Sequence, residues 1–154
     1  LYVASAIGNK PAVKFDGDDD VLLVDKAGLG GFHTRTIILV ARIVSVSDSK
    51  GLFVFHPTAS ANDDGDSFAL EQFENTFRAR WRSWSGYGGL TLSFNRWPDL
   101  KVPRVITITM DKVSKTGKVY FENVLANTVT YTDTNDLPTA LKFLMGSRSY
   151  DAAS

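Results

Sequence analysis

Hydrophobic and polar residues alternate with a period of two in several short segments of this chain. The clearest case is residues 105–110, where Ile106, Ile108 and Met110 alternate with valine and threonine. Such alternation places successive side chains on opposite faces of a half-buried β-strand. Turn-forming residues separate these segments at close intervals, so we expect an all-β sandwich or barrel. The predicted strands are 12–15, 21–24, 36–46, 52–55, 67–73, 76–84, 90–94, 105–110, 119–125 and 128–132.

Two segments depart from simple alternation. Residues 36–46 are rich in β-branched residues and apolar on both faces, which predicts an inner strand of a sandwich that is covered on two sides. Residues 136–146 begin with Asp136, carry Pro138 in the first turn and close with Gly146. Those are helix boundary signals, and the local pattern favours a short helix and a strand equally.

The segment 76–84 reads Thr-Phe-Arg-Ala-Arg-Trp-Arg-Ser-Trp, and its two faces differ in chemistry. Phe77, Ala79 and Trp81 share one face, which belongs to a core. The opposite face is a row of arginines that ends in an aromatic residue, and it is the strongest candidate for a binding surface. Its residues are Arg78, Arg80, Arg82 and Trp84.

Length and charge limit the classes of function. The chain has 154 residues, enough for one domain with its own core. Seventeen Lys and Arg balance seventeen Asp and Glu, which disfavours a general nucleic-acid binder. No apolar run is long enough to span a membrane. Cysteine is absent, which excludes disulfides, thiolate metal sites and a cysteine nucleophile. The chain starts at Leu1 rather than Met, so we expect a processed product or a piece of a longer protein.

The order of these signals resembles a known superfamily along nearly the whole chain. Residues 11–22, Pro-Ala-Val-Lys-Phe-Asp-Gly-Asp-Asp-Asp-Val-Leu, resemble the opening of concanavalin A-like lectin/glucanase domains, in particular laminin-G-like and pentraxin-like jelly rolls. Residues 36–42 look like the long strand that follows, and 105–111 look like the middle strand. The resemblance implies an antiparallel β-sandwich of jelly-roll type. It also favours a strand near 142–145, because Leu144-Met-Gly-Ser-Arg148 is similar to the family's next-to-last strand.

The chain departs from this family pattern in two places. After Tyr120 the family tends to place Asn-Gly in a tight turn, whereas this chain has Glu122-Asn123-Val124 and lacks the glycine that a positive-φ turn prefers. The family also ends with one more strand, which pairs back toward the first. We therefore expect that the domain either was cut before its last strand or has that strand supplied by another protein subunit, since sheet edges are usually covered.

Catalysis is not expected. The glucanases of this superfamily carry acidic residues at alternate positions of one strand, and no such array is present. Glu71 and Glu74 are three residues apart, which sends them to opposite faces of a strand, and Glu122 is isolated. His33 and His56 belong to no recognisable nucleophile motif. We therefore interpret the chain as a non-enzyme.

Two acidic turns are candidates for a calcium site. Carboxylate oxygens crowd residues 16–20 and 62–66, and Ca²⁺ prefers oxygen ligands. Neither turn has the twelve-residue calcium pattern, and aspartates also cap turns through their own backbone. No cofactor other than calcium is suggested. The candidate ligands are Asp16, Asp18, Asp63 and Asp66.

The resemblance implies a carbohydrate ligand, so we expect a recognition or adhesion module that is displayed outside a cell or on a virus particle. Arginine is a forked donor that suits acidic sugars, and aromatic rings provide a platform for a sugar ring. The alternative is a structural component of a virion or assembly, such as a phage fibre, decoration or capsid-associated domain, that uses the sandwich for subunit contacts. The arginines could equally pair with acidic residues on adjacent strands. The candidate ligand-binding residues are Arg78, Arg80, Arg82, Trp84, Tyr87 and Arg96.

Overall fold

The fold was analysed in a computed structural model, which describes residues 2–16, 20–27, 34–42, 51–56, 67–73, 76–82, 91–94, 101–130 and 141–146. Within these ranges the chain forms twelve β-strands and no α-helix. The strands are β1 (Tyr2–Ile7), β2 (Lys10–Val13), β3 (Leu22–Ala27), β4 (Thr34–Ala41), β5 (Gly51–His56), β6 (Ser67–Phe73), β7 (Thr76–Arg82), β8 (Thr91–Phe94), β9 (Arg104–Asp111), β10 (Thr116–Phe121), β11 (Val124–Thr130) and β12 (Leu141–Met145).

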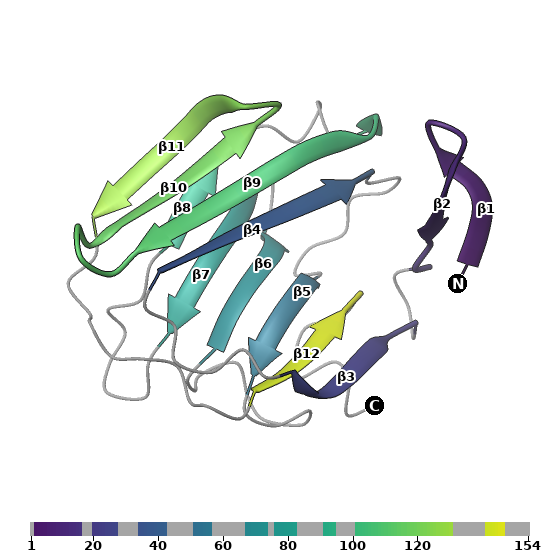
Figure 1. Cartoon of the computed structure of the whole chain (residues 1–154), viewed down its shortest axis with the longest axis horizontal. Coiled ribbons are helices and arrows are strands. Elements are labelled where there is room, and N and C mark those ends of the chain that lie inside the picture. The colour runs from purple at the N-terminus through teal and green to yellow at the C-terminus, as the bar shows by residue number, and fades with distance from the viewer. Residues whose placement is uncertain are drawn as a thin grey trace.

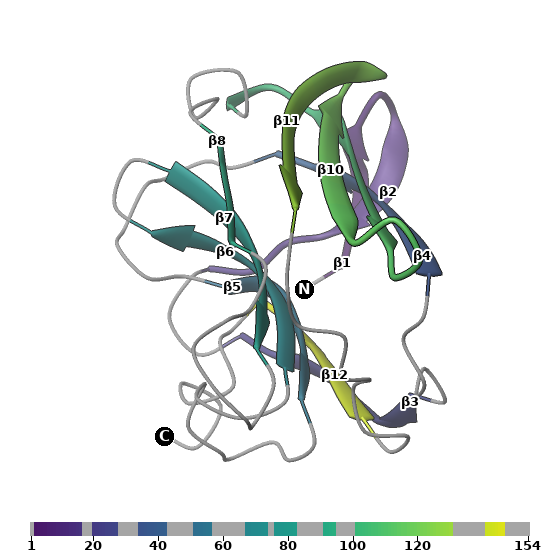
Figure 2. The same cartoon turned by 90° about the vertical axis from the view of Figure 1, so that its left-hand side faces the viewer.

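Two antiparallel sheets face each other. One has four strands in the order β11-β10-β9-β4, and the other has six in the order β3-β12-β5-β6-β7-β8. The four-stranded sheet lies in front of the six-stranded sheet in Figure 1, and Figure 2 shows the two layers from the side. Every strand pairing in the described residues is antiparallel. The expected antiparallel β-sandwich is confirmed.

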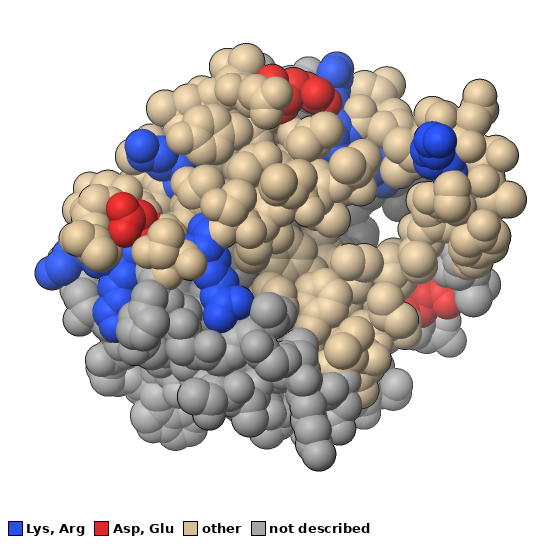
Figure 3. All heavy atoms as spheres, in the orientation of Figure 1, with Lys and Arg blue, Asp and Glu red and all other residues tan. Residues whose placement is uncertain are grey.

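The hairpin β1–β2 forms a separate two-stranded sheet beside the sandwich. Its turn consists of Gly8 and Asn9, both at positive φ, the conformation that tight hairpin turns prefer. Tyr2, Val3 and Val13 are exposed although all three are large apolar residues. Figure 3 shows the hairpin at the right-hand side of the molecule, with an opening between it and the sandwich. The hairpin therefore contributes little to the main core.

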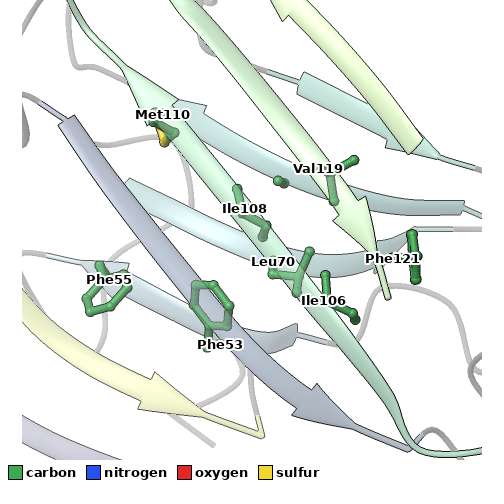
Figure 4. Close-up of a cluster of buried hydrophobic side chains, with 9 residues drawn as sticks. Phe53, Phe55, Leu70, Ile106, Ile108, Met110, Val119 and Phe121 are labelled. Atoms are coloured by element: carbon green, nitrogen blue, oxygen red, sulfur yellow. The ribbon is translucent and has the colours of Figure 1, made fainter. Parts of the chain in front are cut away.

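The core fills the space between the two sheets. Strands β9 and β10 contribute alternate residues, so that side chains such as Ile106, Ile108 and Val119 point inward while their neighbours point outward. The six-stranded sheet contributes Leu70, which is fully buried, and a phenylalanine pair whose ring centroids are 5.7 Å apart. Figure 4 shows side chains from both sheets converging on this cluster. Its buried members are Phe53, Phe55, Leu70, Ala79, Ile106, Ile108, Met110, Val119 and Phe121.

The predicted environment of residues 36–46 was wrong. Among the described strands β4 is the edge of the four-stranded sheet, and only β9 pairs with it. Ile37 and Leu39 pack against the core, but Ile38 on the other face is 68% exposed. An apolar residue on each face of a strand does not show that both faces are covered, because coverage depends on strands that are distant in the sequence. Residues 43–46 lie outside the described residues.

The predicted strand 119–125 was also wrong, because a turn divides it. Glu122 and Asn123 both have positive φ, 48° and 66°, and connect β10 to β11 without glycine. The backbone N–H of Glu122 donates to the carbonyl of Val105 at 3.0 Å, and its Oε1 accepts from the N–H of Val105 at 3.0 Å. These two hydrogen bonds fix the turn against the start of β9 and compensate for the αL conformation of a residue that rarely adopts it.

The ambiguous segment near the end of the described chain forms a strand. Strand β12 lies between β3 and β5 and pairs with both, so the preference for a strand near 142–145 is confirmed. Gly146 directly follows the strand, and its N–H donates to the carbonyl of Leu52 at 3.1 Å. Gly146 has a φ of 92°, and a side chain at this position would collide with the ring of Phe15. Glycine is therefore required where β12 ends.

Candidate functional site

The arginine-bearing strand β7 lies in the six-stranded sheet between β6 and β8. Glu71 of β6 is directly opposite Arg78 in the antiparallel ladder. The Nη2 of Arg78 donates to Oε1 of Glu71 at 2.9 Å. The Glu71 side chain is fully buried, whereas 19% of the Arg78 side chain is exposed. At Arg78 the arginine row therefore contains a largely buried ion pair rather than a solvated cation.

The same face of the six-stranded sheet also buries apolar residues. Val54, Ala69 and Leu144 form a second hydrophobic cluster, distinct from the core between the sheets. Ala69 lies opposite Arg80 in the ladder and two residues before Glu71, so the cluster and the ion pair share one face. This part of the arginine-bearing face is thus covered. The alternative in which an arginine pairs with an acidic residue on the adjacent strand is what the structure shows at Arg78.

The remaining predicted ligand residues extend from this pair toward the end of β7. In the ladder between β6 and β7, Arg80 lies opposite Ala69 and Arg82 lies opposite Ser67. These pairings fix the backbone positions of both arginines. Their ligand-binding role stays a prediction, because the side chains of both lie outside what the structure describes. Three further candidates fall outside the described residues altogether. They are Trp84, Tyr87 and Arg96.

The first acidic turn is only partly described. The backbone N–H of Asp16 donates to Oδ2 of Asp20 at 3.2 Å, so this carboxylate caps the turn. No group of three or more His, Asp or Glu side chains that could hold a metal is found among the described residues. Calcium stays a prediction, because its other candidate ligands lie outside those residues. They are Asp18, Asp63 and Asp66.

Sequence reasoning did not identify the outer face of the four-stranded sheet as a candidate surface. A row of residues crosses all four strands on this face, because Thr107 pairs with Ile38 on one side and with Tyr120 on the other, and Tyr120 pairs with Leu125. Figure 3 shows few charged side chains over the middle of this face. The alternation of 116–121 does contain the signal, since Tyr120 must point away from Val119 and the core.

Sugar-binding sites combine an aromatic ring with hydroxyl and amino groups that donate hydrogen bonds. Tyr120 is half-buried, and its neighbours on the outer face include Thr107 across β9 and Lys118 two residues earlier on β10. Thr109 is opposite Lys118 in the ladder. This outer face therefore offers a second place at which a ligand could bind, separate from the arginine row.

The carboxylate of Asp111 is engaged in a turn rather than in a site. It accepts from the Ser114 hydroxyl at 2.8 Å, the Val113 N–H at 2.9 Å and the Thr34 hydroxyl at 3.4 Å. The hydrogen bond from Ser114, and next that from Val113, lower the pKa of this carboxyl below its ordinary value. Asp111 thus links β4 to the β9–β10 hairpin. Elsewhere on β4, partial burial lowers the pKa of the Arg35 guanidinium.

Comparisons with known proteins relate the chain to others by structure alone. No family model and no curated protein sequence matches it. The CBM40 domain of a Ruminococcus gnavus IT-sialidase, bound to α2,3-sialyllactose, shares 16% identity at a TM-score of 0.63 and covers 78% of this chain and 67% of that one. The binding domain of Paraclostridial Mosquitocidal Protein 1 has a TM-score of 0.67 at 14% identity, covering 98% of this chain and 39% of that one.

Mouse laminin α1 chain, domains LG4-5, is similar as well, with a TM-score of 0.67, 13% identity, and coverage of 94% of this chain and 35% of that one. These likenesses show the fold: the chain is an all-β, antiparallel sandwich of jelly-roll type. The resemblance to lectin-like jelly rolls is supported to that extent. In the part of the chain that the structure describes, no helix is long and apolar enough to cross a membrane.

Proposed function

We propose that this protein is a non-catalytic carbohydrate-recognition module that acts outside a cell or on the surface of a virus particle. The observation that carries this proposal is the match to the CBM40 domain of the Ruminococcus gnavus IT-sialidase. In its complex with α2,6-sialyllactose the match covers 85% of this chain and 82% of that one, so the two correspond as whole domains. By contrast, the match covers only 22% of a leech intramolecular trans-sialidase.

The arginine row supplies the chemistry for an acidic sugar. A guanidinium can donate two parallel hydrogen bonds to a carboxylate, and an adjacent aromatic ring can pack against a sugar ring. Arg80, Arg82 and Arg96 are the proposed donors, and Trp84 and Tyr87 are the proposed platform. Arg78 adjoins them, and its pairing with Glu71 holds its guanidinium in one position.

The test is a glycan array with the isolated chain, in buffers with and without calcium. Arg80→Ala and Trp84→Ala should abolish binding if the arginine row is the site, while Tyr120→Ala should leave it intact. The matched control is Lys101→Ala, an exposed cation outside both candidate surfaces. Calcium-dependent binding would support ligation by Asp16, Asp18, Asp63 and Asp66. Loss of binding in Tyr120→Ala alone would move the site to the outer face of the four-stranded sheet. Absence of binding to any glycan would refute the proposal.

A second function is favoured by the open edge of the four-stranded sheet. Strand β4 is unpaired on one side among the described strands, and Ile38 and Val40 on its outward face are exposed. A structural component of a virion or other assembly could complete this sheet with a strand from another subunit. Such a role predicts that the β4 amides that point away from β9 exchange rapidly in the isolated chain and become protected in the assembled particle. Equal exchange in both states would exclude strand completion at β4.

A further inference from the structure

A row of basic residues crosses four neighbouring strands of the six-stranded sheet, β12, β5, β6 and β7 (Figure 1). Lys142 of β12 lies opposite His56 of β5, and Ser67 of β6 lies opposite Arg82 of β7. The antiparallel ladder of β5 and β6 ends at the residues next to His56 and Ser67, which places these two at the same level of the sheet. The four residues, which we call the basic row, therefore lie side by side across the strands.

The basic row belongs to the arginine-bearing face of the sheet rather than to the core. Phe55 is part of the core between the sheets, so alternation places His56 on the opposite face of β5. Val54 of the second hydrophobic cluster is two residues before His56 and shares its face. The basic row thus adjoins this cluster and meets the arginine row at Arg82.

The four strands that carry the basic row contain a single acidic residue, and it is paired elsewhere. That residue is Glu71, whose carboxylate accepts from Arg78. On the other side of β12, a register shift sets Asp25 and Lys26 of β3 beside Lys142, and the charges of these two residues cancel. Within these described strands, positive charge therefore exceeds negative charge along the basic row.

The segment that joins β5 to β6 also bears on this balance. It begins next to His56, ends next to Ser67, carries three aspartates at positions 63, 64 and 66, and lies outside the described residues. These aspartates are the countercharges that could compete with a bound anion. A measurement at His56 separates the two cases, because the pKa of an imidazole responds to the charges that lie beside it.

Positive charge along the basic row favours a bound anion, because like charges at opposite positions of a ladder repel each other. Adjacent strands are about 4.8 Å apart, so the row spans about 14 Å from Lys142 to Arg82 and has room for more than one acidic group. We propose that the basic row binds a second carboxylate of the acidic glycan, beside the carboxylate that Arg80 binds. This inference rests on the proposed function, and it narrows the ligand to an oligosaccharide with two acidic sugars. Since His56 gains its charge below about pH 6.5, the second site strengthens in mild acid.

NMR of the imidazole groups tests the anion site without any glycan, and His33 is the internal reference because the chain has two histidines. Inorganic sulfate, added at constant ionic strength, should raise the pKa of His56, because an anion favours the charged imidazole. Lys142→Met should raise the same pKa without sulfate, because it removes the like charge opposite His56, and it should weaken sulfate binding about two- to fivefold. Lys101→Met removes an exposed cation outside these surfaces and should change neither quantity.

Two results would overturn the proposal. A pKa of His56 that responds neither to sulfate nor to Lys142→Met would show that the segment 57–66 already balances the basic row. An equal response of His33 and His56 to sulfate would show a general salt effect.

Calorimetry with two oligosaccharides tests the ligand class, since sialyllactose carries one carboxylate and disialyllactose carries two. At about pH 5.5 the native chain should bind disialyllactose about tenfold more tightly than sialyllactose, and this advantage should shrink as His56 loses its charge. His56→Gln and Lys142→Met should lower the affinity for disialyllactose toward that for sialyllactose. Equal binding of the two sugars by the native chain would overturn the second carboxylate site and leave the proposed function standing. Failure of every glycan on the array, with the sulfate response of His56 intact, would refute the carbohydrate role and support the anion site.

Discussion

The ion pair between Glu71 and Arg78 should contribute more to stability than a surface salt bridge does. Arg78→Met keeps most of the side-chain volume but removes the guanidinium, and it leaves the Glu71 carboxylate without this cation in a fully buried position. Breaking a buried pair from one side costs about 3–5 kcal/mol. Because 19% of the Arg78 side chain is exposed, we expect a loss near 3 kcal/mol, at the lower end of that range. This is a large fraction of the stability of a small domain.

The two single variants should not be equivalent. Glu71→Met leaves Arg78 able to turn its partly exposed guanidinium toward water, so its cost should be about 1–2 kcal/mol. The double variant removes both charges and fills the space with apolar groups, so it should regain most of the loss and approach the stability of the native chain. A double-mutant cycle from these variants should then give a coupling energy above about 1.5 kcal/mol between the two side chains.

Urea unfolding followed by tryptophan fluorescence measures these differences, since the chain has three tryptophans. Lys118→Met is the matched control, because it removes a cation from a strand of the other sheet and should change the unfolding free energy by no more than about 0.5 kcal/mol. A loss below about 1 kcal/mol for Arg78→Met would mean that the pair behaves like an exposed salt bridge, and it would refute the burial argument.

Three other predictions concern backbone and titration. Gly146→Ala should lower stability by about 2–4 kcal/mol in urea unfolding, because an added methyl group collides with Phe15 at a φ that alanine rarely adopts; an unchanged midpoint would contradict this. Asn123→Gly should raise the free energy of unfolding by about 0.5–1 kcal/mol and so raise the melting temperature modestly, because glycine adopts the positive φ of 66° at this position without strain. The pKa of Asp111 is lowered in the folded state, so its stabilisation is present above the ordinary value of 3.8 and is lost as the pH falls through the lower folded value. The melting temperatures of the native chain and Asp111→Asn should therefore differ at neutral pH and converge in acid, and a constant difference would show that the hydrogen bonds of Asp111 act without its charge.

Strands were predictable where period-two alternation coincides with burial. Residues 105–110 were predicted as a strand, and β9 covers Arg104–Asp111 with its alternate residues fully buried. The hairpin strand β1 was not predicted, because its alanine and serine residues have weak β propensity and no buried face marks it. The resemblance pointed to a tight turn after Tyr120, but the strand pattern 119–125 ran through Glu122 and Asn123, because this turn lacks glycine and depends on hydrogen bonds to Val105 on a neighbouring strand.

The position of a strand within its sheet could not be predicted from its own residues. Both β4 and β3 carry aliphatic residues on both faces, and both are edge strands among the strands described. An aliphatic residue on each face of a strand is compatible with both positions, because coverage depends on strands that are distant in the sequence. The residues of a strand therefore do not fix its place in a sheet, which only the topology shows.

The arginine row shows the same limit at the level of the candidate site. Alternation correctly assigned Ala79 to the core, but it could not show that the opposite face carries the buried Glu71 in register with Arg78. Since this carboxylate balances the charge of Arg78, that arginine adds no net positive charge for an acidic sugar to use. The electrostatic attraction that we propose for such a ligand therefore rests on Arg80, Arg82 and Arg96. Loss of Arg80 should accordingly abolish glycan binding, whereas loss of Arg78 should reduce the stability of the domain first.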